Sequence, residues 1–392
     1  MMNFEMLEST TKGTVIKVVG VGGAGGNAVS HMINNGVNGV DFICANTDAQ
    51  ALSMTNAPVQ IRLGRTGLGA GAKPDQGRSA AETAREEIRS ALNGAHMVFI
   101  AAGMGGGTGT GAGPIVAEVA KELGILTVGV VTKPFSFEGP KRMKVAEDGI
   151  AELSRHVHSL IVVLNEKLED LMDEDADQMD CFKAADDVLH NACAGIAEII
   201  NVEGNINVDF EDVKTIMGEQ GQAMMGTAIA NGAERARIAA EKAIACPLLE
   251  GVDLNGARGV LVNITASRSL KMRETKEIMQ IIRSYASEDA TVIFGTAYDD
   301  AMGDDLRVTV VATGLGKTVA RPQLVQSAAA DLRTGTDNLV YAATQQHGDY
   351  RGMDVPSVMR NPRSHATAQV RALESSGMDH FDIPAFLRKQ AD

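Results

Sequence analysis

The sequence predicts an α/β fold: a Rossmann-like domain with a mostly parallel sheet, a central helix, and a second, smaller α/β domain. Wholly apolar runs such as 97–102 are typical of strands buried on both faces of a parallel sheet. Glycine-rich turns follow this run and the strand-like segment Val15–Val19, and each leads into a helical pattern. The long apolar segment Cys181–Ile200 lies between two strand-forming halves, which predicts a helix that joins them.

Composition limits the classes of protein that the chain can represent. Its 392 residues allow two domains, and 44% apolar with 22% charged residues are typical of a soluble protein. The net charge of −14 argues against binding nucleic acid through phosphates. Four scattered cysteines, without metal-ligand spacing, predict reduced thiols. With no apolar run of membrane-spanning length and no signal peptide, we expect a cytoplasmic protein.

The first glycine-rich turn spans residues 20–27, between a strand at Val15–Val19 and a helix at Ala28–Ile33. Gly20, Gly22 and Gly25 match G-x-G-x-x-G, the dinucleotide fingerprint. Asp48 follows the second predicted strand, Val40–Ala45, and could hold a ribose. An NAD-binding oxidoreductase is therefore one alternative function.

The second glycine-rich turn, 103–113, follows the strand at 97–102. Glycines let backbone amides approach and surround an anion, and a following helix adds the positive end of its dipole. Pro114 predicts the first position of a helix that runs to Leu123. Two such cradles at one site favour a triphosphate over a pyrophosphate. A P-loop is absent, because Gly314–Thr318 lacks the first glycine of that motif.

The rest of the first domain follows the same alternation. A third glycine-rich stretch, 64–74, predicts a mobile loop, and Gln76–Leu92 predicts a helix. Glu138 and Arg142 follow a strand at Leu126–Thr132; they predict either a surface ion pair or a contact to ribose and phosphate. Asn165 follows a strand at Ser159–Leu164. The acidic stretch 166–180 lacks the spacing of a calcium loop and predicts a solvated loop or a helix start.

Carboxylates gather after the central helix, at Asp209 and Asp212. Asp209 predicts an N-cap for a helix at Phe210–Met217. The same carboxylates could instead polarise a water for phosphoryl transfer. Because they would repel a triphosphate in their own molecule, delivery by a second subunit is favoured.

The second domain is predicted from helices at Glu234–Ala245 and Leu270–Tyr285 and strands at Gly259–Ala266, Ala290–Tyr298 and Leu306–Thr313. We expect no site chemistry in it. Residues 318–378 have the polar composition of a flexible linker. In the tail, Ile383, Phe386 and Leu387 recur at helical spacing, which predicts a short docking helix. The predicted divisions are therefore 1–13, 14–178, 179–202, 203–317, 318–378 and 379–392.

The segment Gly105–Gly111 resembles the signature of the tubulin/FtsZ superfamily of polymerising GTPases. The resemblance runs from about Val15 to about Gly316 and resumes in the last dozen residues. It implies a GTPase that binds GTP or GDP, with Mg²⁺ held through the phosphates and no protein ligand of the metal identified. The residues implied to bind nucleotide are Gly22, Gly23, Ala24, Gly25, Gly26, Asn27, Gly71, Ala72, Gly106, Gly107, Thr108, Gly109, Thr132, Glu138, Arg142, Asn165 and Asp187.

The resemblance also implies function beyond the nucleotide. Asn207, Asp209 and Asp212 would complete the site of the next protomer in a head-to-tail protofilament at the midcell division ring. Membrane-tethering and regulatory division proteins such as FtsA would bind the tail through Asp382, Ile383, Pro384, Phe386 and Leu387. For Asp187, an exposed helix charge remains the alternative to a contact with guanine. A filament scaffold without hydrolysis is the second alternative function.

Overall fold

The computed structural model describes residues 13–169, 177–201, 206, 208–218, 221–246, 257–287 and 289–315. Several predicted features lie outside these ranges: residues 1–12 of the N-terminal segment, residues 170–176 of the acidic stretch, Asn207, the linker and the tail residues Asp382, Ile383, Pro384, Phe386 and Leu387. They remain predictions.

The first half of the sheet contains six parallel strands in the order β3-β2-β1-β4-β5-β6. They are β1 (Ile16–Val21), β2 (Val40–Asn46), β3 (Val59–Arg62), β4 (Met97–Gly103), β5 (Leu126–Lys133) and β6 (Ser159–Leu164). Helical segments connect them: α1 (Gly22–Asn34), α2 (Ala49–Ser53), α3 (Pro74–Thr83), α4 (Arg85–Leu92), α5 (Thr108–Glu122), η1 (Ser136–Glu138), α6 (Pro140–Leu153) and α7 (Asn165–Glu169).

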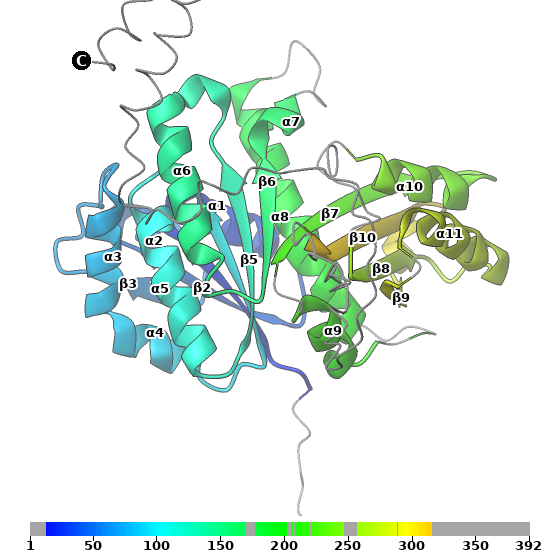
Figure 1. Cartoon of the computed structure of the whole chain (residues 1–392), viewed down its shortest axis with the longest axis horizontal. Coiled ribbons are helices and arrows are strands. Elements are labelled where there is room, and N and C mark those ends of the chain that lie inside the picture. The colour runs from blue at the N-terminus through cyan, green and yellow to red at the C-terminus, as the bar shows by residue number, and fades with distance from the viewer. Residues whose placement is uncertain are drawn as a thin grey trace, which may run out of the picture. The chain divides into compact units, whose positions relative to one another are not determined.

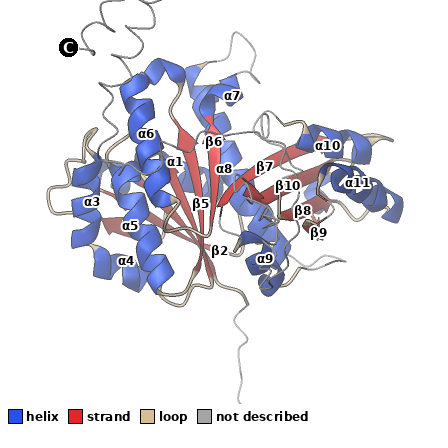
Figure 2. Cartoon of the chain, viewed as in Figure 1, coloured by secondary structure: helices blue, strands red, loops and turns tan. Residues whose placement is uncertain are grey.

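Helices cover both faces of these strands (Figure 2). Consecutive residues of a strand point to opposite faces; Val18 packs in the core with α1 and α8, whereas Val19 packs in the core with α4, α5 and α6. Burial on both faces explains why the central strand β4 is apolar throughout its length. It also leaves the carboxyl ends of the strands as the place where polar loops gather.

The second half begins with α8 (Gln178–Asn201) and α9 (Phe210–Met217). It continues with β7 (Gly221–Ala230), α10 (Arg235–Ile244), β8 (Gly259–Ala266), α11 (Met272–Tyr285), β9 (Thr291–Tyr298), η4 (Asp300–Met302) and β10 (Leu306–Leu315). Its strands follow the order β7-β10-β8-β9 and join the first half through β7, which pairs with β6 over Ser159–Ile161 and Gly221–Ala223. The strands of both predicted domains therefore belong to one ten-stranded sheet.

Both glycine-rich turns contain more helix than the sequence predicted. Helix α1 begins at Gly22 and α5 begins at Thr108, so Pro114 lies inside α5 and not at its first position. Glycine is a poor helix former in isolation, but tertiary packing requires it here: a Cβ at Gly25 would lie 2.3 Å from the carbonyl oxygen of Ala101. Close packing against β4 overrides the local preference for a turn.

Other elements differ from the sequence prediction. The helix predicted at Gln76–Leu92 is broken at Ala84 into α3 and α4. Helix α6 and strands β3 and β7 were not predicted. Strand β7 contains Gly221, Gly226 and several alanines, so it has little of the β-branched and aromatic enrichment that marks a strand. By contrast, β8 and α9 have the predicted bounds.

Candidate nucleotide site

A cavity of about 290 Å³ lies at the carboxyl ends of β1, β4, β5 and β6, where an open α/β sheet binds its ligands. Twelve of the predicted nucleotide residues line it: Gly23, Ala24, Asn27, Gly71, Gly106, Gly107, Thr108, Gly109, Thr132, Glu138, Arg142 and Asn165. The other lining residues were not among those individually assigned to the nucleotide: Val21, Gly103, Met104, Lys133, Pro134, Phe182, Ala185, Asp186 and Leu189.

The amino ends of two helices meet at this cavity. The first turn of α1 contributes Gly23 and Ala24, and the first turn of α5 contributes Thr108 and Gly109. The first amides of a helix have no partner within the helix and lie at the positive end of its dipole. Two such ends at one cavity make a binding site for an anion with several phosphates.

Glycine is required where three chain segments come together. Gly105 has φ of 96°, and a Cβ there would lie 2.8 Å from Cγ of Arg142. A Cβ on Gly107 would lie 2.2 Å from the carbonyl oxygen of Gly71, which belongs to the loop at residues 64–73. This loop therefore packs directly against the second glycine-rich turn, residues 103–113, which we call the phosphate loop. A side chain at Gly107 would force the two apart.

Threonine hydroxyl groups form hydrogen bonds that fix the conformation of the phosphate loop. The amide of Gly105 donates to Oγ1 of Thr110 at 2.9 Å. Oγ1 of Thr108, at the first position of α5, lies 2.6 Å from Oγ1 of Thr47, which follows β2.

The end of the cavity beside α8 suits a nucleobase. Asn165 is 5% exposed, and its Oδ1 has no hydrogen-bond partner among the described residues, so it is available to a ligand donor. The ring of Phe182 packs edge-on against Phe135, with centroids 5.3 Å apart. Asp186 also lines the cavity, and burial, with a smaller contribution from Asp187, raises its pKa from 3.8 to about 6.

The structure corrects the assignment of Asp187. Asp186 lines the cavity, whereas Oδ1 of Asp187 lies 2.6 Å from Nε2 of His31 on α1. Neighbouring residues of a helix point about 100° apart, and sequence spacing did not show which aspartate faces the nucleotide. Asp187 is therefore neither a cavity residue nor an unpartnered surface charge.

Four more predicted residues, Gly22, Gly25, Gly26 and Ala72, do not line the cavity. The three glycines instead pack closely against neighbouring segments. A Cβ added to Gly22 would lie 2.9 Å from the amide nitrogen of Gly109, and a Cβ added to Gly26 would lie 3.3 Å from Cγ2 of Thr55. Gly22 and Gly25 thus let α1 approach α5 and β4 closely, and Gly26 lets it approach Thr55.

Glu138 and Arg142 form the ion pair expected from their spacing, and they do so at the cavity. Nη1 of Arg142 lies 2.8 Å from Oε2 of Glu138, and both residues line the cavity. Oε1 of Glu138 also accepts from the amide of Phe135 at 2.9 Å, which fixes the carboxylate. The guanidinium is thereby held at the cavity rim, where it can pair with a phosphate.

Asp209 forms the predicted N-cap. Its Oδ1 accepts from the amide of Asp212 at 2.8 Å, and both side chains are exposed. Neither residue lines the cavity, and Asn207 is outside the described residues. Asp48 is likewise occupied, because its Oδ1 caps α2 by accepting from Gln50 and Ala51. It does not line the cavity as a ribose-binding acid would.

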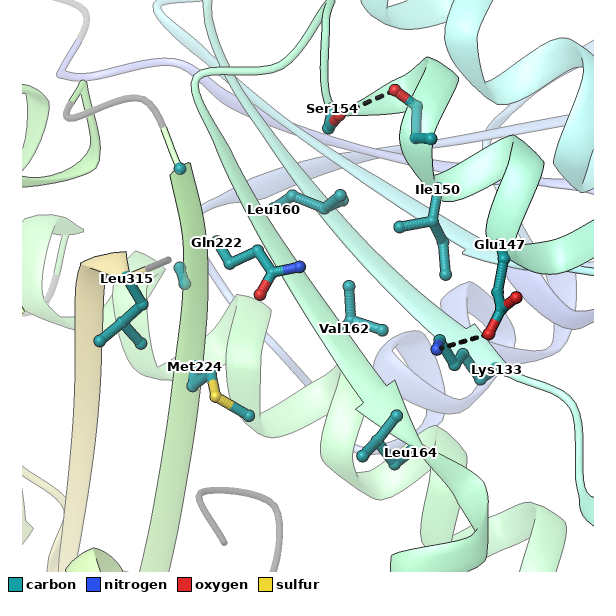
Figure 3. A pocket seen from close by; sticks show the side chains of 13 residues that line it. Lys133, Glu147, Ile150, Ser154, Leu160, Val162, Leu164, Gln222, Met224 and Leu315 are labelled. Carbon is teal, nitrogen blue, oxygen red and sulfur yellow. Dashed lines mark hydrogen bonds and ion pairs between the residues drawn. The ribbon is translucent and has the colours of Figure 1, made fainter. Parts of the chain in front are cut away.

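A larger cavity of about 670 Å³ lies where β6 and β7 diverge, beside α6 (Figure 3). Its lining is mostly apolar, with Ile150, Leu160 and Val162 on one side and Met224 on the other. Lys133 and Glu147 form an ion pair of 3.6 Å at one end. Because no glycine-rich helix start borders it, this cavity does not suit phosphates.

Two further expectations can be compared with the described residues. All four cysteines are free, and burial raises the pKa of Cys44 and Cys193 above its usual value. Within the described ranges, no helix has the length and apolarity needed to cross a bilayer.

Comparison with known proteins agrees with this geometry. Residues 15–173 match the GTPase domain of the tubulin/FtsZ family, and residues 221–316 match the C-terminal domain of the FtsZ family. The cell division protein FtsZ of Pseudomonas aeruginosa is 53% identical over 99% of this chain and 100% of its own length. The chain belongs to the FtsZ family.

Other FtsZ proteins show the same relationship. FtsZ of Coxiella burnetii is 51% identical over 98% of this chain and 99% of its own length. The structure of an FtsZ dimer from M. jannaschii, 42% identical, superposes with a TM-score of 0.74 and covers 78% of this chain and 89% of that one. The chain is thus a tubulin-like GTPase and a filament-forming cell division protein, as the glycine-rich signature predicted. The oxidoreductase alternative is not favoured.

Proposed function

We propose that this FtsZ-family chain binds GTP in the cavity between α1, α5 and α8, and that a second copy completes the hydrolytic site in a head-to-tail filament. The helix ends at α1 and α5 would hold the phosphates, and Asn165 and Asp186 would contact the base. Asp209 and Asp212, with Asn207, would act on the nucleotide of the neighbouring copy by orienting the attacking water.

The distance between cavity and carboxylates carries this proposal. Ala185 lines the cavity near the start of α8, and the helix runs on to Asn201. Sixteen helical steps at about 1.5 Å each separate these two residues by about 24 Å. Asp209 lies beyond that end, at the start of α9, which Figure 1 shows at the other end of α8 from α7.

A second relationship supports the same separation. Phe210, next to Asp209, packs against His96 with ring centroids 6.0 Å apart. His96 immediately precedes β4, whereas Gly103 at the other end of β4 lines the cavity. A strand of this length spans about 20 Å. The carboxylates therefore lie near the start of β4, whereas the cavity of the same molecule lies at its end, too far away for them to reach the nucleotide there. A contact between copies that repeats head to tail gives an open filament.

We further propose that Mg²⁺ binds through the nucleotide phosphates. No cluster of three or more His, Cys, Asp or Glu side chains that could hold a metal occurs within the described ranges. Bound there, the ion would neutralise charge on the phosphates. For the tail, we propose a docking role toward membrane-tethering and regulatory division proteins such as FtsA, and we place the filament at the midcell division ring in the cytoplasm.

The decisive experiment measures phosphate release per molecule against protein concentration, with GTP and ATP compared. A site shared between two copies predicts a rate per molecule that rises with concentration, and the base contacts predict a preference for GTP. A rate per molecule that stays constant down to demonstrably monomeric dilution would refute the shared site. Assembly without phosphate release would instead favour the scaffold alternative.

A further inference from the structure

Thr47 is a buried residue, 4% exposed, to which the sequence analysis assigned no role. It follows β2 and does not line the nucleotide cavity. Its hydroxyl nevertheless lies 2.6 Å from that of Thr108, which does line the cavity and begins α5. Thr47 therefore contacts the phosphate loop through Thr108 without lining the cavity itself.

The backbone around Thr47 binds a second segment of the site. The carbonyl of Thr47 accepts from the amide of Gly69 at 3.1 Å, and the amide of Ala49 donates to the carbonyl of Gly67 at 3.0 Å. Gly67 and Gly69 belong to the loop at residues 64–73, which contributes Gly71 to the cavity. One short segment thus holds two loops that border the same cavity.

From these contacts we infer that Thr47 is a positioning residue for nucleotide binding: it orients the Thr108 hydroxyl toward the phosphates and links the phosphate loop to the loop at 64–73. This inference rests on the proposed nucleotide site.

The direction of the hydrogen bond follows from the chemistry of the ligand. A threonine hydroxyl has one proton, and phosphate oxygens at neutral pH only accept. For Thr108 to donate to a phosphate, Thr47 must donate the proton of the Thr47–Thr108 bond. Without Thr47, the Thr108 hydroxyl would rotate freely and lose the polarisation that a chain of hydrogen bonds provides.

The test uses three single variants and equilibrium binding of GTP at protein concentrations too dilute for assembly. Thr47→Val removes the hydroxyl at nearly constant volume, and Thr47→Ser keeps it. Thr127→Val is the matched control, because Thr127 is also fully buried and donates to a backbone carbonyl, that of Ile125, at 2.9 Å near the start of β5, at the opposite edge of the sheet.

We expect Thr47→Val to weaken GTP binding by about three- to tenfold, the effect of one hydrogen bond. Thr47→Ser should bind within about twofold of wild type, and so should Thr127→Val. In a Thr108→Val background, Thr47→Val should have little further effect, because Thr47 acts through Thr108. If Thr47→Val does not fold, Thr47→Ala takes its place in the same comparison.

Three results would overturn the inference. They are unchanged GTP affinity in Thr47→Val, the same loss of affinity in Thr47→Ser as in Thr47→Val, and an equal loss of affinity from Thr47→Val in the wild-type and Thr108→Val backgrounds. Each is distinct from failure of the proposed site, which would appear as absence of GTP binding by the wild-type protein.

Discussion

His31 on α1 and Asp187 on α8 join the two helices beside the base end of the nucleotide cavity, with 2.6 Å between Nε2 and Oδ1. This pairing turns Asp187 away from the cavity and leaves Asp186 to line it. Two adjacent aspartates on one helix thus have different partners, and substitutions can separate their roles.

Asp186→Ala is expected to weaken GTP binding by tenfold or more and to reduce the preference for GTP over ATP, because a charged hydrogen bond to the base is lost. Asp187→Ala is expected to weaken GTP binding by no more than about threefold, since it acts only through His31. Titration of both variants with GTP and ATP measures this. The opposite ranking would return the base contact to Asp187.

The raised pKa of Asp186 predicts a pH-dependent stability of the nucleotide-free protein. Burial favours the protonated form, so the folded state binds more protons than the unfolded state between about pH 4 and pH 6. The protonated carboxyl of Asp186 is therefore compatible with the folded state below about pH 4, and the folded protein loses stability as the pH rises through about 6 and this carboxyl ionises. Asp186→Asn should therefore raise the free energy of unfolding by about 1 kcal/mol at pH 7.5, after allowing for partial exposure, and change it little at pH 4.

Denaturant unfolding at the two pH values, without nucleotide, measures this effect. Asp187→Asn is the matched control: it weakens the contact with His31 and should not stabilise the protein at pH 7.5. Equal effects of Asp186→Asn at both pH values would contradict the assigned pKa.

Asp209→Asn should retain GTP binding and assembly but lose hydrolysis by at least a hundredfold, because asparagine still caps α9 but cannot act as a carboxylate. Asp209→Ala should also destabilise the helix, by about 1 kcal/mol. Normal phosphate release by Asp209→Asn would leave the cap as the only role of this residue.

Mixing two inactive variants tests whether the site is shared. Gly107→Ala should prevent nucleotide binding, because its Cβ would lie 2.2 Å from the carbonyl oxygen of Gly71. Gly113→Ala on the same helix meets nothing within 4 Å and is the control. A mixture of Asp209→Asn with Gly107→Ala should recover phosphate release, because Gly107→Ala supplies intact carboxylates to the GTP held by Asp209→Asn. No recovery, in a mixture shown to co-assemble, would argue against delivery by a neighbour.

Arg235→Met should destabilise the second half of the chain by about 3 kcal/mol, since it leaves a partly buried carboxylate unpaired. Arg235 is 6% exposed, and its Nε and Nη2 lie 2.7 and 3.1 Å from the two carboxylate oxygens of Glu274. Arg237→Met removes an exposed arginine two positions away and should leave the unfolding midpoint unchanged. Similar midpoints for the two variants would show that the buried pair contributes nothing.

The sequence predicted the elements with strong patterns and missed those formed by tertiary contacts. Strand β8 and helix α9 were predicted to the residue, because their periodicity and cap are local signals. Strand β7 was missed because its small residues are explained only by its neighbours β6 and β10. In the site, the glycine-rich segments were found from composition alone. Thr47 and Asp186 were not, because the hydroxyl contact and the rotation of α8 exist only in the folded chain.

The length of α8 has a consequence for a row of linked copies. The end of α8 nearest Asp209 lies about 24 Å from Ala185 at the cavity. If hydrolysis needs the carboxylates of a neighbour, a row contains one fewer complete catalytic centre than it has members. In that case, the member whose nucleotide has no neighbouring carboxylates would keep its triphosphate, whereas the members inside the row would hydrolyse theirs. The two tips of the row therefore differ chemically, and growth and shrinkage need not occur at the same tip.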